Sequence, residues 1–428
     1  MAWQDVAAEL TSASPSGKAV AVLGGGFCGL ACAYEFAQRG YGVAVIDCGA
    51  QAGLAPASSA AAGLLDPLTP KGRLAWMARD AMDAALRLLQ ASANAHKGPL
   101  FQRTGAVHVP RDAKHAKSLR EGASELDSAT ARWLGCDAAA ALVGCGDGFQ
   151  CPPDGVLHCP EAVVVDTQRY LEALWHLSCA CTVCKWICKR VETVRALAEH
   201  FDVVVIAAGA GCCVVEETRH LPVELSRGQV LEYAPNTTVG SGDGGGSCCW
   251  DLRLPLTGSV YVVPQLHPHG GFARLDCGGT YEPCECLRDA WQDAPPNASV
   301  ATDHLDGALK RLFPAMRDAG TPVKARAGVR ATPPRSALGA APLIGRAHSS
   351  AGQDNVWFCG GMGSRGLLYH ALAAGWLADA ATNGDASRLP DEVRRCEFGH
   401  MLARKLAVLA ERQQADQESD SLAAMPAM

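Results

Sequence analysis

The sequence contains no apolar run of the roughly 18 residues that a membrane-spanning helix requires. Residues 1–17 also lack the basic start and the apolar stretch of a secretory signal, and they contain no arginine of the kind that transit peptides carry. We therefore expect no membrane association. We expect a cytoplasmic location, or an organelle lumen if a transit peptide is missing from this sequence.

An excess of positive charge is absent as well. The chain has 38 lysines and arginines against 44 aspartates and glutamates, which gives a formal net charge of −6. This balance excludes a broad electrostatic attraction to nucleic acid or to an anionic membrane, although a local basic patch stays open. The sequence has no internal repeat, and its 428 residues predict two domains, or one large core with an insertion.

Cysteine is plentiful, but the length of the chain excludes a small disulfide scaffold. Without a secretory signal, the twenty cysteines are expected to be free thiols in a reducing compartment. The sharpest metal candidate is the group Cys179, Cys181, Cys184 and Cys188. This segment looks like a strand, whose side chains alternate between faces, and it has no glycine or proline for a turn. We therefore expect no metal site.

The most informative stretch is AVAVLGGGFCGLACAYEFAQRGYGVAVID at residues 19–47. It reads as a buried strand, a glycine-rich turn, a helix and a second strand. Gly24, Gly26 and Gly29 have the G-x-G-x-x-G spacing, which permits a tight turn, close approach of a pyrophosphate, and close helix–strand packing. Asp47 follows Gly24 by 23 residues, where a carboxylate can bind a ribose. The pattern predicts a dinucleotide site; the competing interpretation is a tight strand–helix turn without a ligand.

Further strands that end in glycine lie far away in the sequence, at residues 203–209 and 356–363. They fit a parallel sheet whose carboxyl ends face one crevice. A nucleotide domain assembled from such separated pieces favours FAD over a nicotinamide cofactor.

These features, together with several further motifs, resemble the D-amino-acid-oxidase-type (DAO) flavoproteins over most of residues 18–385. Within them the chain is most similar to the MnmC-like branch, the FAD-dependent oxidase domains of bacterial tRNA wobble-uridine modification enzymes. The further motifs are SSAAAGLLDPLTP at 58–70, IAAGAG at 206–211, SRGQV at 226–230, YVVP at 261–264, GGTYEP at 278–283, GVRATPPRSALGAAPLIG at 328–345 and GGMGSRGLLYHALAAGWLA at 360–378.

The resemblance implies an α/β fold: a Rossmann-like, glutathione-reductase-like FAD-binding domain with an inserted α+β substrate domain built on an antiparallel sheet. We expect the FAD-binding domain to be discontinuous and the end of the chain to form a helical tail. The expected boundaries are 18–100, 151–222 and 325–385 for the FAD-binding domain, 101–150 and 223–324 for the substrate domain, and 386–428 for the tail.

The resemblance also implies which residues bind FAD. Gly24, Gly26 and Gly29 would cradle the pyrophosphate, and Asp47 would bind the adenosine ribose. The remaining cofactor contacts would lie near the pyrophosphate, along the cofactor body and at the start of the last helix. They are Ser58, Ser59, Gly63, Ala208, Gly209, Gly363, Ser364, Arg365, Gly366 and Leu367.

Three residues are candidates for the substrate site. Arg330 sits in a motif whose arginine pairs with the substrate carboxylate in similar oxidases, and its competing role is to brace a turn before two prolines. Arg365 would contact flavin or substrate, or else form a surface ion pair. Tyr261 would bind substrate, or else only pack. His370 is expected to be a buried, hydrogen-bonded core residue, and Arg227 and Gln229 are weaker candidates.

The predicted function is FAD-dependent oxidation of a C–N bond in an amine or amino acid that carries a carboxylate. The substrate is either a free amino acid, such as glycine, sarcosine or a D-amino acid, or a carboxymethylaminomethyl group on a tRNA wobble uridine. The acidic charge balance does not support tRNA as a partner. A non-catalytic flavin-binding protein and an NAD(P)-binding protein are two competing interpretations, and the oligomeric state stays open.

Overall fold

The structure is a computed structural model, and it describes residues 2–54, 56–96, 98–145, 148–234, 252–266, 272–284, 295–334, 339, 341–347 and 353–394. Most of the predicted C-terminal tail lies outside these residues. Its described beginning contains the short 3-10 helix η5 (Ala386–Arg388).

A six-stranded sheet carries the glycine-ended strands of the sequence. Its order is β17-β18-β10-β1-β2-β9, and all neighbouring pairs are parallel except β17 with β18. The strands β18, β10 and β1 are adjacent although they come from three distant parts of the chain, as predicted. The bounds are β1 (Ala19–Leu23), β2 (Gly42–Asp47), β9 (Cys184–Cys188), β10 (Val203–Ile206), β17 (Leu343–Arg346) and β18 (Val356–Gly360).

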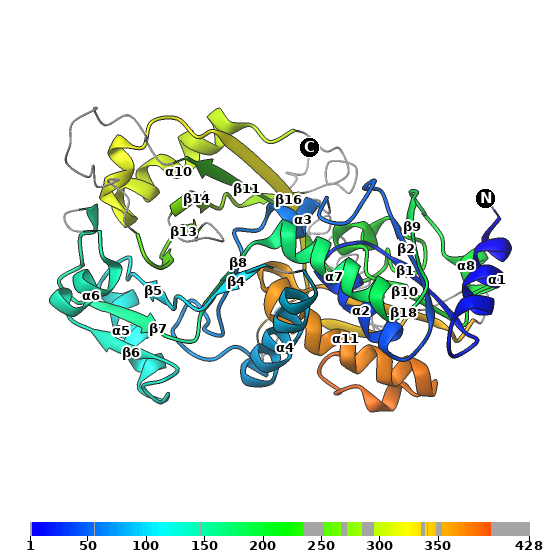
Figure 1. Cartoon of the computed structure of the whole chain (residues 1–428). Coiled ribbons are helices and arrows are strands. Elements are labelled where there is room, and N and C mark those ends of the chain that lie inside the picture. Colours follow the sequence, from blue (N-terminus) through cyan, green and yellow to red (C-terminus); the bar gives the residue numbers. More distant parts are fainter. Residues whose placement is uncertain are drawn as a thin grey trace, which may run out of the picture.

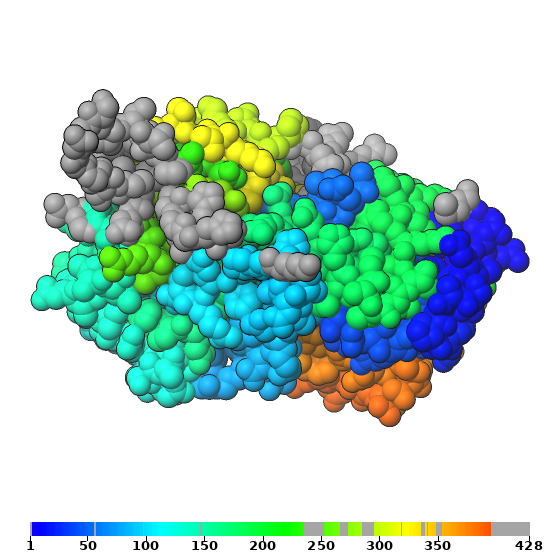
Figure 2. Space-filling view, in the orientation of Figure 1, coloured from blue at the N-terminus to red at the C-terminus, as the bar shows by residue number. Residues whose placement is uncertain are grey.

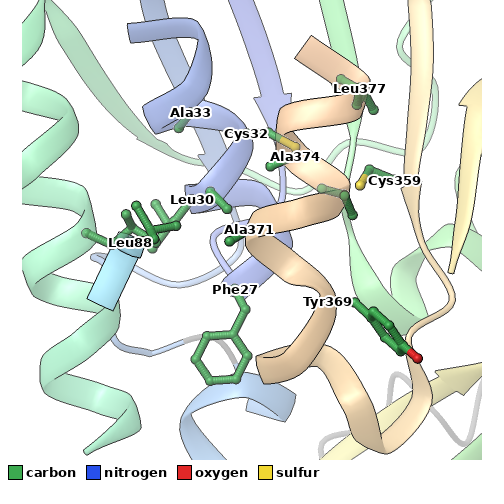
Figure 3. Packing of buried hydrophobic residues seen from close by; sticks show 14 of the residues in the cluster. Phe27, Leu30, Cys32, Ala33, Leu88, Cys359, Tyr369, Ala371, Ala374 and Leu377 are labelled. Atoms are coloured by element: carbon green, nitrogen blue, oxygen red, sulfur yellow. The ribbon is translucent and has the colours of Figure 1, made fainter. Parts of the chain in front are cut away.

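Helices cover both faces of this sheet because its central strands are apolar on both sides (Figure 1). On one face α2 (Phe27–Gln38) and α11 (Gly366–Asn383) pack on the strands, and α4 (Ala78–His96) and α7 (Thr167–Cys181) pack on these two helices. Figure 3 shows the apolar contact of α2 with α11 through Leu30, Ala371 and Ala374. The other face packs against α1 (Trp3–Ala13), α8 (Arg195–Ala198) and η2 (Gly209–Cys213).

A nine-stranded, mostly antiparallel sheet forms the second large unit. Its order is β15-β11-β14-β13-β12-β5-β7-β6, with β16 paired to the other edge of β11. The bounds are β5 (Ala106–His108), β6 (Arg132–Leu134), β7 (Val156–Cys159), β11 (Glu224–Tyr233), β12 (Leu256–Thr257), β13 (Tyr261–Leu266), β14 (Phe272–Gly278), β15 (Glu282–Pro283) and β16 (Lys324–Thr332). These two sheets confirm the predicted α/β class with a second, antiparallel unit.

One face of the nine-stranded sheet is closed by α10 (Ala298–Leu312), which packs on Leu231, Val262 and Leu275 (Figure 1). The remaining elements are short helices and strands at the edge of the nine-stranded sheet and beside the six-stranded sheet. They are α3 (Pro56–Ala60), β3 (Leu64–Leu65), β4 (Phe101–Gln102), α5 (Ala113–Ala123), α6 (Cys136–Val143), β8 (Val163–Val165), η3 (Pro314–Asp318) and η4 (Gly363–Arg365). In Figure 2 the N-terminal residues (dark blue) and the segment around β5 to β7 (cyan) lie at opposite ends of the molecule.

The sheet membership departs from the sequence-based domain boundaries at two places. The strands β7 and β16 belong to the nine-stranded sheet, although residues 151–222 and 325–385 were assigned to the cofactor domain. The reason is hydrogen-bond pairing: β7 pairs with β5 and β6, and β16 pairs along the full length of β11. The domain boundaries otherwise remain a proposal.

The cysteine-rich segment also differs from its prediction. Helix α7 continues to Cys181 and the strand β9 begins only at Cys184, so the two cysteines lie on different elements rather than on one strand. Among the described residues, no helix is long and apolar enough to cross a membrane.

Candidate functional site

A cavity of about 790 Å³ lies between the two large sheets. Its wall includes the carboxyl ends of β1, β10 and β18 and one face of the nine-stranded sheet. This volume falls within the range of sites that hold a cofactor or a small ligand. All the predicted cofactor and substrate residues line it except Gly29 and Ser59; of the two weaker candidates, Arg227 lines it and Gln229 does not.

The glycine-rich turn forms the first part of the wall. Gly24 has φ +111°, and a Cβ atom there would lie 2.4 Å from the carbonyl oxygen of Ala207. Helix α2 starts directly after Gly26 with no cap from that residue's side chain, and its first residues, Phe27 and Cys28, line the cavity, although the Phe27 N–H already donates to Ser58. At this turn the backbone of Gly24 passes close to Ala207, and the N-terminus of α2, which attracts anions, lies directly beside it.

Gly29 and Asp47, the other two residues of the dinucleotide pattern, have different roles in the site. A Cβ atom at Gly29 would lie 1.8 Å from the carbonyl oxygen of Gly24, so this glycine allows α2 to pack on the turn rather than to face the cavity. Asp47 ends β2, and its carboxylate accepts hydrogen bonds from the backbone N–H groups of Gly25 (2.6 Å) and Gly49 (2.7 Å). These bonds fix the carboxylate at the rim of the cavity.

Residues between β2 and β3, and residues after β10, continue the wall. The Ser58 hydroxyl accepts a hydrogen bond from the Phe27 N–H at 3.1 Å, and Gly63, Ala208 and Gly209 line the cavity. Ser59 does not line it; its carbonyl accepts bonds from Thr167 and Arg326, and therefore serves the contact between elements.

The start of the last helix contributes a second helix N-terminus. Residues 363–367 all line the cavity, and α11 begins there without a side-chain cap. Arg365 donates a hydrogen bond to the carbonyl of Leu68 at 3.3 Å. Arg365 also lies close enough to Asp66 to lower the pKa of that carboxyl group. Within the described residues it is therefore a half-buried residue of the cavity wall and not part of a surface ion pair.

Strand register brings the substrate candidates to one face. Tyr261 is opposite Gly278, Gly228 is opposite Gly328, and Arg330 is two residues beyond Gly328 on the same side of its strand. Because Gly228 and Gly278 have no side chains, there is room for the large polar side chains of Arg330 and Tyr261. A Cβ atom at Gly228 would lie 1.9 Å from Nη2 of Arg330, and one at Gly278 would lie 2.8 Å from the Tyr261 hydroxyl.

Arg330 and Tyr261 converge on one place in the cavity. A Cβ atom at Gly279 would lie 3.1 Å from the Tyr261 hydroxyl and 3.5 Å from Nη2 of Arg330. No carboxylate of the described chain pairs with Arg330, whose hydrogen bond goes to the carbonyl of Thr280 at 3.5 Å. Burial raises the pKa of Tyr261 to about 12, although Arg330 acts to lower it. The hydroxyl group is therefore protonated at neutral pH and can donate a hydrogen bond.

The weaker candidates Arg227 and Gln229 are engaged in a network at the sheet edge. Arg227 pairs with Glu282 at 2.8 Å, and Gln229 donates to the same carboxylate and accepts from the Asn297 N–H. His370 is fully buried in α11, as expected. Its Nδ1 donates to the Leu367 carbonyl, so Nε2 accepts from the Tyr170 hydroxyl at 2.7 Å.

The structure adds two groups of residues that the sequence reasoning missed. Asp66 and His108 line the cavity as a pair, with 2.9 Å between Oδ2 and Nε2. Burial by itself would raise the pKa of Asp66, but His108 and the Leu68 N–H lower it below the usual value. Cys28 and Cys359 also line the cavity. The Asp66–His108 pairing had no local signature in the sequence, because the two residues are 42 positions apart.

The site fits an anionic dinucleotide such as FAD. It offers two helix N-termini, a close backbone approach at Gly24, and a fixed carboxylate at the end of β2. Besides Asp47, the only acidic residue in the described wall is Asp66, which is already paired. Arg111, Arg227, Arg330 and Arg365 also line the cavity, so its charge favours an acidic ligand.

Comparisons with known proteins agree with this assignment. A family model described as "FAD dependent oxidoreductase" (DAO) matches residues 19–380. Two similar curated proteins are both called "tRNA 5-methylaminomethyl-2-thiouridine biosynthesis bifunctional protein MnmC". The one from Polaromonas naphthalenivorans is 27% identical over 92% of this chain and 61% of its own length, and the one from Verminephrobacter eiseniae is 28% identical over 87% and 62%. The chain thus spans about 60% of the length of these relatives.

Solved structures share the fold. Glycine oxidase from Geobacillus kaustophilus superimposes with a TM-score of 0.67 at 18% identity, over 89% of this chain and 97% of that one. Iminodiacetate oxidase from Chelativorans sp. BNC1 gives a TM-score of 0.65 at 20% identity, over 87% of this chain and 98% of that one.

Proposed function

The chain belongs to the DAO family of FAD-dependent oxidoreductases, and from this premise we propose that it oxidises a C–N bond of an amine that carries a carboxylate. FAD is the cofactor, and when bound it supplies the hydride acceptor. The amine would bind in its neutral form, lose a hydride from the adjacent carbon, and give an imine that water hydrolyses.

The observation that carries the proposal is the position of Arg330. Its guanidinium faces the cavity beside the Tyr261 hydroxyl, and no carboxylate of the described chain neutralises it. A planar guanidinium matches a carboxylate with two parallel hydrogen bonds, and a protonated tyrosine adds a third donor. We assign Arg330 and Tyr261 to binding and orienting the substrate carboxylate. Arg365, at the start of α11, is assigned to the cofactor or substrate side of the cavity.

The amine part of the proposal draws on the relatives. The MnmC proteins are named for the biosynthesis of a methylaminomethyl group, which contains a carbon–nitrogen bond of the proposed kind. Cofactor binding is assigned to Gly24 and Gly26 for the pyrophosphate, with Gly29 supporting the turn, and to Asp47 for the ribose. The cavity walls at Ser58, Gly63, Ala208, Gly209 and residues 363–367 would complete the cofactor site, with Ser59 holding this segment in place.

Two substrate classes follow from the same chemistry. A free amino acid, such as glycine, sarcosine or a D-amino acid, needs only the Arg330–Tyr261 site. A carboxymethylaminomethyl group on a tRNA uridine would also need a basic rim, and Arg111 and His115 on the cavity wall supply part of one. The net charge of −6 favours the free amino acid. A flavin-binding protein without catalysis is the competing proposal of a different class.

Anaerobic reduction of the FAD-loaded protein tests the proposal. Glycine, sarcosine, D-alanine and tRNA that carries carboxymethylaminomethyluridine are each added, and bleaching of the visible flavin absorbance is followed. We expect bleaching by at least one carboxylate-bearing amine and much slower bleaching by its carboxamide analogue. Failure of all four substrates would favour the flavin-binding protein without catalysis.

Substitution of Arg330 then tests the role of the guanidinium. Arg330→Met should remove the preference for the carboxylate over the carboxamide, and Arg330→Lys should restore only part of it, because ammonium lacks the planar fork. Arg195→Met is the matched control, since Arg195 lies on α8 in an exposed pair with Glu216. An unchanged preference in Arg330→Met would refute the assignment.

A further inference from the structure

Three cysteine side chains converge where α2, β18 and α11 meet. The sulfur atoms of Cys28, Cys32 and Cys359 all lie within 4.8 Å of one another. Sγ of Cys28 is 3.1 Å from Sγ of Cys359 and 3.2 Å from the carbonyl oxygen of the same residue. Figure 3 shows Cys32 on α2 beside Ala374 of α11, and Cys359 on the neighbouring strand β18. This group is separate from the residues assigned to substrate.

Cys28 is the one partly exposed residue of the three. Cys28 and Cys359 line the cavity together with Gly24 and Gly26, although Cys359 is fully buried, and Cys32 is fully buried one helical turn further along α2. A small oxidant can therefore reach Cys28 from the cavity. A dinucleotide bound against Gly24 and Gly26 would cover the same part of the wall.

The environment separates the roles of the three thiols. Hydrogen bonds from Cys32 and then from Cys359 lower the pKa of Cys28 to about 5, against the effect of burial. Cys28 is also the second residue of α2, where backbone N–H groups and the helix dipole stabilise a thiolate. The pKa values of Cys32 and Cys359 are raised. Cys28, the partly exposed thiol at the helix start and the one whose pKa is lowered, is therefore the nucleophile; before ionising, its S–H donates a hydrogen bond to the Cys359 carbonyl.

Geometry decides which neighbour can form a disulfide with Cys28. Cys32 is four residues away on the same helix, where Cβ atoms are about 5–6 Å apart, and a disulfide needs about 3.5–4.5 Å. Cys359 comes from another element, and its sulfur atom already touches that of Cys28. A disulfide from Cys28 therefore goes to Cys359, while Cys32 supports the thiolate.

We propose that Cys28 and Cys359 are a redox-active thiol pair, which hydrogen peroxide converts to a disulfide and which bound FAD shields. The Cys28 thiolate attacks one peroxide oxygen, the O–O bond breaks, and the released hydroxide takes up a proton to become water. The Cys359 thiol then attacks the resulting sulfenic acid, the S–O bond breaks, and its proton leaves with the hydroxide as a second water. One peroxide is reduced to two waters while two thiols become one disulfide.

Peptide mapping of the full chain tests this proposal without using substrate turnover. The FAD-free and FAD-loaded proteins are treated with hydrogen peroxide, the remaining thiols are alkylated, and the digests are compared by mass spectrometry. We expect a Cys28–Cys359 disulfide in the FAD-free protein and at least tenfold slower formation in the loaded protein. The exposed Cys179, which lies on α7 and does not line the cavity, is the internal reference.

Two variants sharpen the test. Cys28→Ser should abolish the disulfide, and Cys32→Ala should still form it, more slowly because the hydrogen bond from Cys32 to the thiolate is lost. A Cys28–Cys32 linkage, a Cys28 oxidised beyond sulfenic acid beside a free Cys359, or equal rates with and without FAD would each overturn the proposal. The mapping of the unmutated chain decides between these outcomes even if a variant does not fold.

Discussion

The glycine at position 228 offers the sharpest test of how this cavity binds an anionic substrate. Gly228 lies in β11, and a Cβ atom there would be 1.9 Å from Nη2 of Arg330. Ordinary contact begins at 3.4 Å, so the guanidinium must retreat by about 1.5 Å in Gly228→Ala. The nearest backbone atom, the carbonyl oxygen of Thr280, is 3.2 Å away and needs to yield only slightly.

This shift of the guanidinium should weaken substrate binding and leave the stability of the fold unchanged. Hydrogen bonds to a charged group contribute about 1.5–3 kcal/mol, and a retreat of about 1.5 Å breaks at least one of the two bonds that Arg330 would make. Because each ~1.4 kcal/mol is tenfold, the dissociation constant for a carboxylate-bearing amine should rise about 10- to 100-fold. Alanine is favoured over glycine inside a strand by roughly 0.5–1 kcal/mol, so stability should not fall.

The assay is anaerobic titration of flavin bleaching with the substrate found above, alongside a thermal melt. Gly375→Ala is the matched control, because its new methyl group meets no atom within 4 Å and lies on α11. We expect unchanged affinity in Gly375→Ala and weakened affinity with an unchanged melting temperature in Gly228→Ala. Wild-type affinity in Gly228→Ala would refute the assignment of Arg330 to the carboxylate.

Three further predictions follow from individual contacts. Gly24→Ala forces a Cβ atom to 2.4 Å from a backbone oxygen at φ +111°, so the protein should purify with less than about a tenth of its FAD; a full flavin-to-protein ratio would contradict this. Burial lowers the pKa of His370 to about 4. Its contribution to stability is therefore fully present above the unfolded pKa of about 6.5 and is lost as the pH falls toward 4. The loss in unfolding free energy amounts to up to about 3 kcal/mol. His370→Gln should therefore flatten the pH dependence of the unfolding free energy over this window, measured by chemical denaturation, and an unchanged slope would count against it. Arg326→Met removes the partner that lies 2.7 Å from the fully buried Asp276 and leaves Arg274, 3.2 Å away, as its remaining cation within the described residues, so it should cost about 1.5–3 kcal/mol in chemical denaturation, with partial recovery in the double variant that adds Asp276→Asn.

Local patterns predicted the cofactor half of the protein well. The G-x-G-x-x-G turn, the apolar strands that end in glycine and the acid at position 47 each impose a backbone conformation within a few residues. The structure has strands at Ala19–Leu23, Val203–Ile206 and Val356–Gly360, side by side in one sheet. The membership of β7 and β16 in the second sheet depends on pairing partners that are distant in the sequence, and local patterns do not specify it.

For the substrate site, the sequence could name individual candidate residues but not how they lie relative to one another. Arg330 and Tyr261 could be named from the sequence, but their meeting at Gly279 depends on the register of β16, β11, β14 and β13. A shift of one residue in any of these pairings would turn a side chain to the opposite face. The space that Gly228 leaves for Arg330 depends on the same register.

The sequence by itself determined the α/β class and the dinucleotide turn, because these depend on short-range backbone geometry and on a local arrangement of strand, turn and helix. FAD as cofactor followed from the glycine-ended strands spread over the chain and from the family resemblance. Only the tertiary structure decided which polar groups share the cavity. The Asp66–His108 pair and the Cys28–Cys359 contact join residues 42 and 331 positions apart. Such contacts depend on how whole elements pack, and no periodicity or spacing along the chain encodes them.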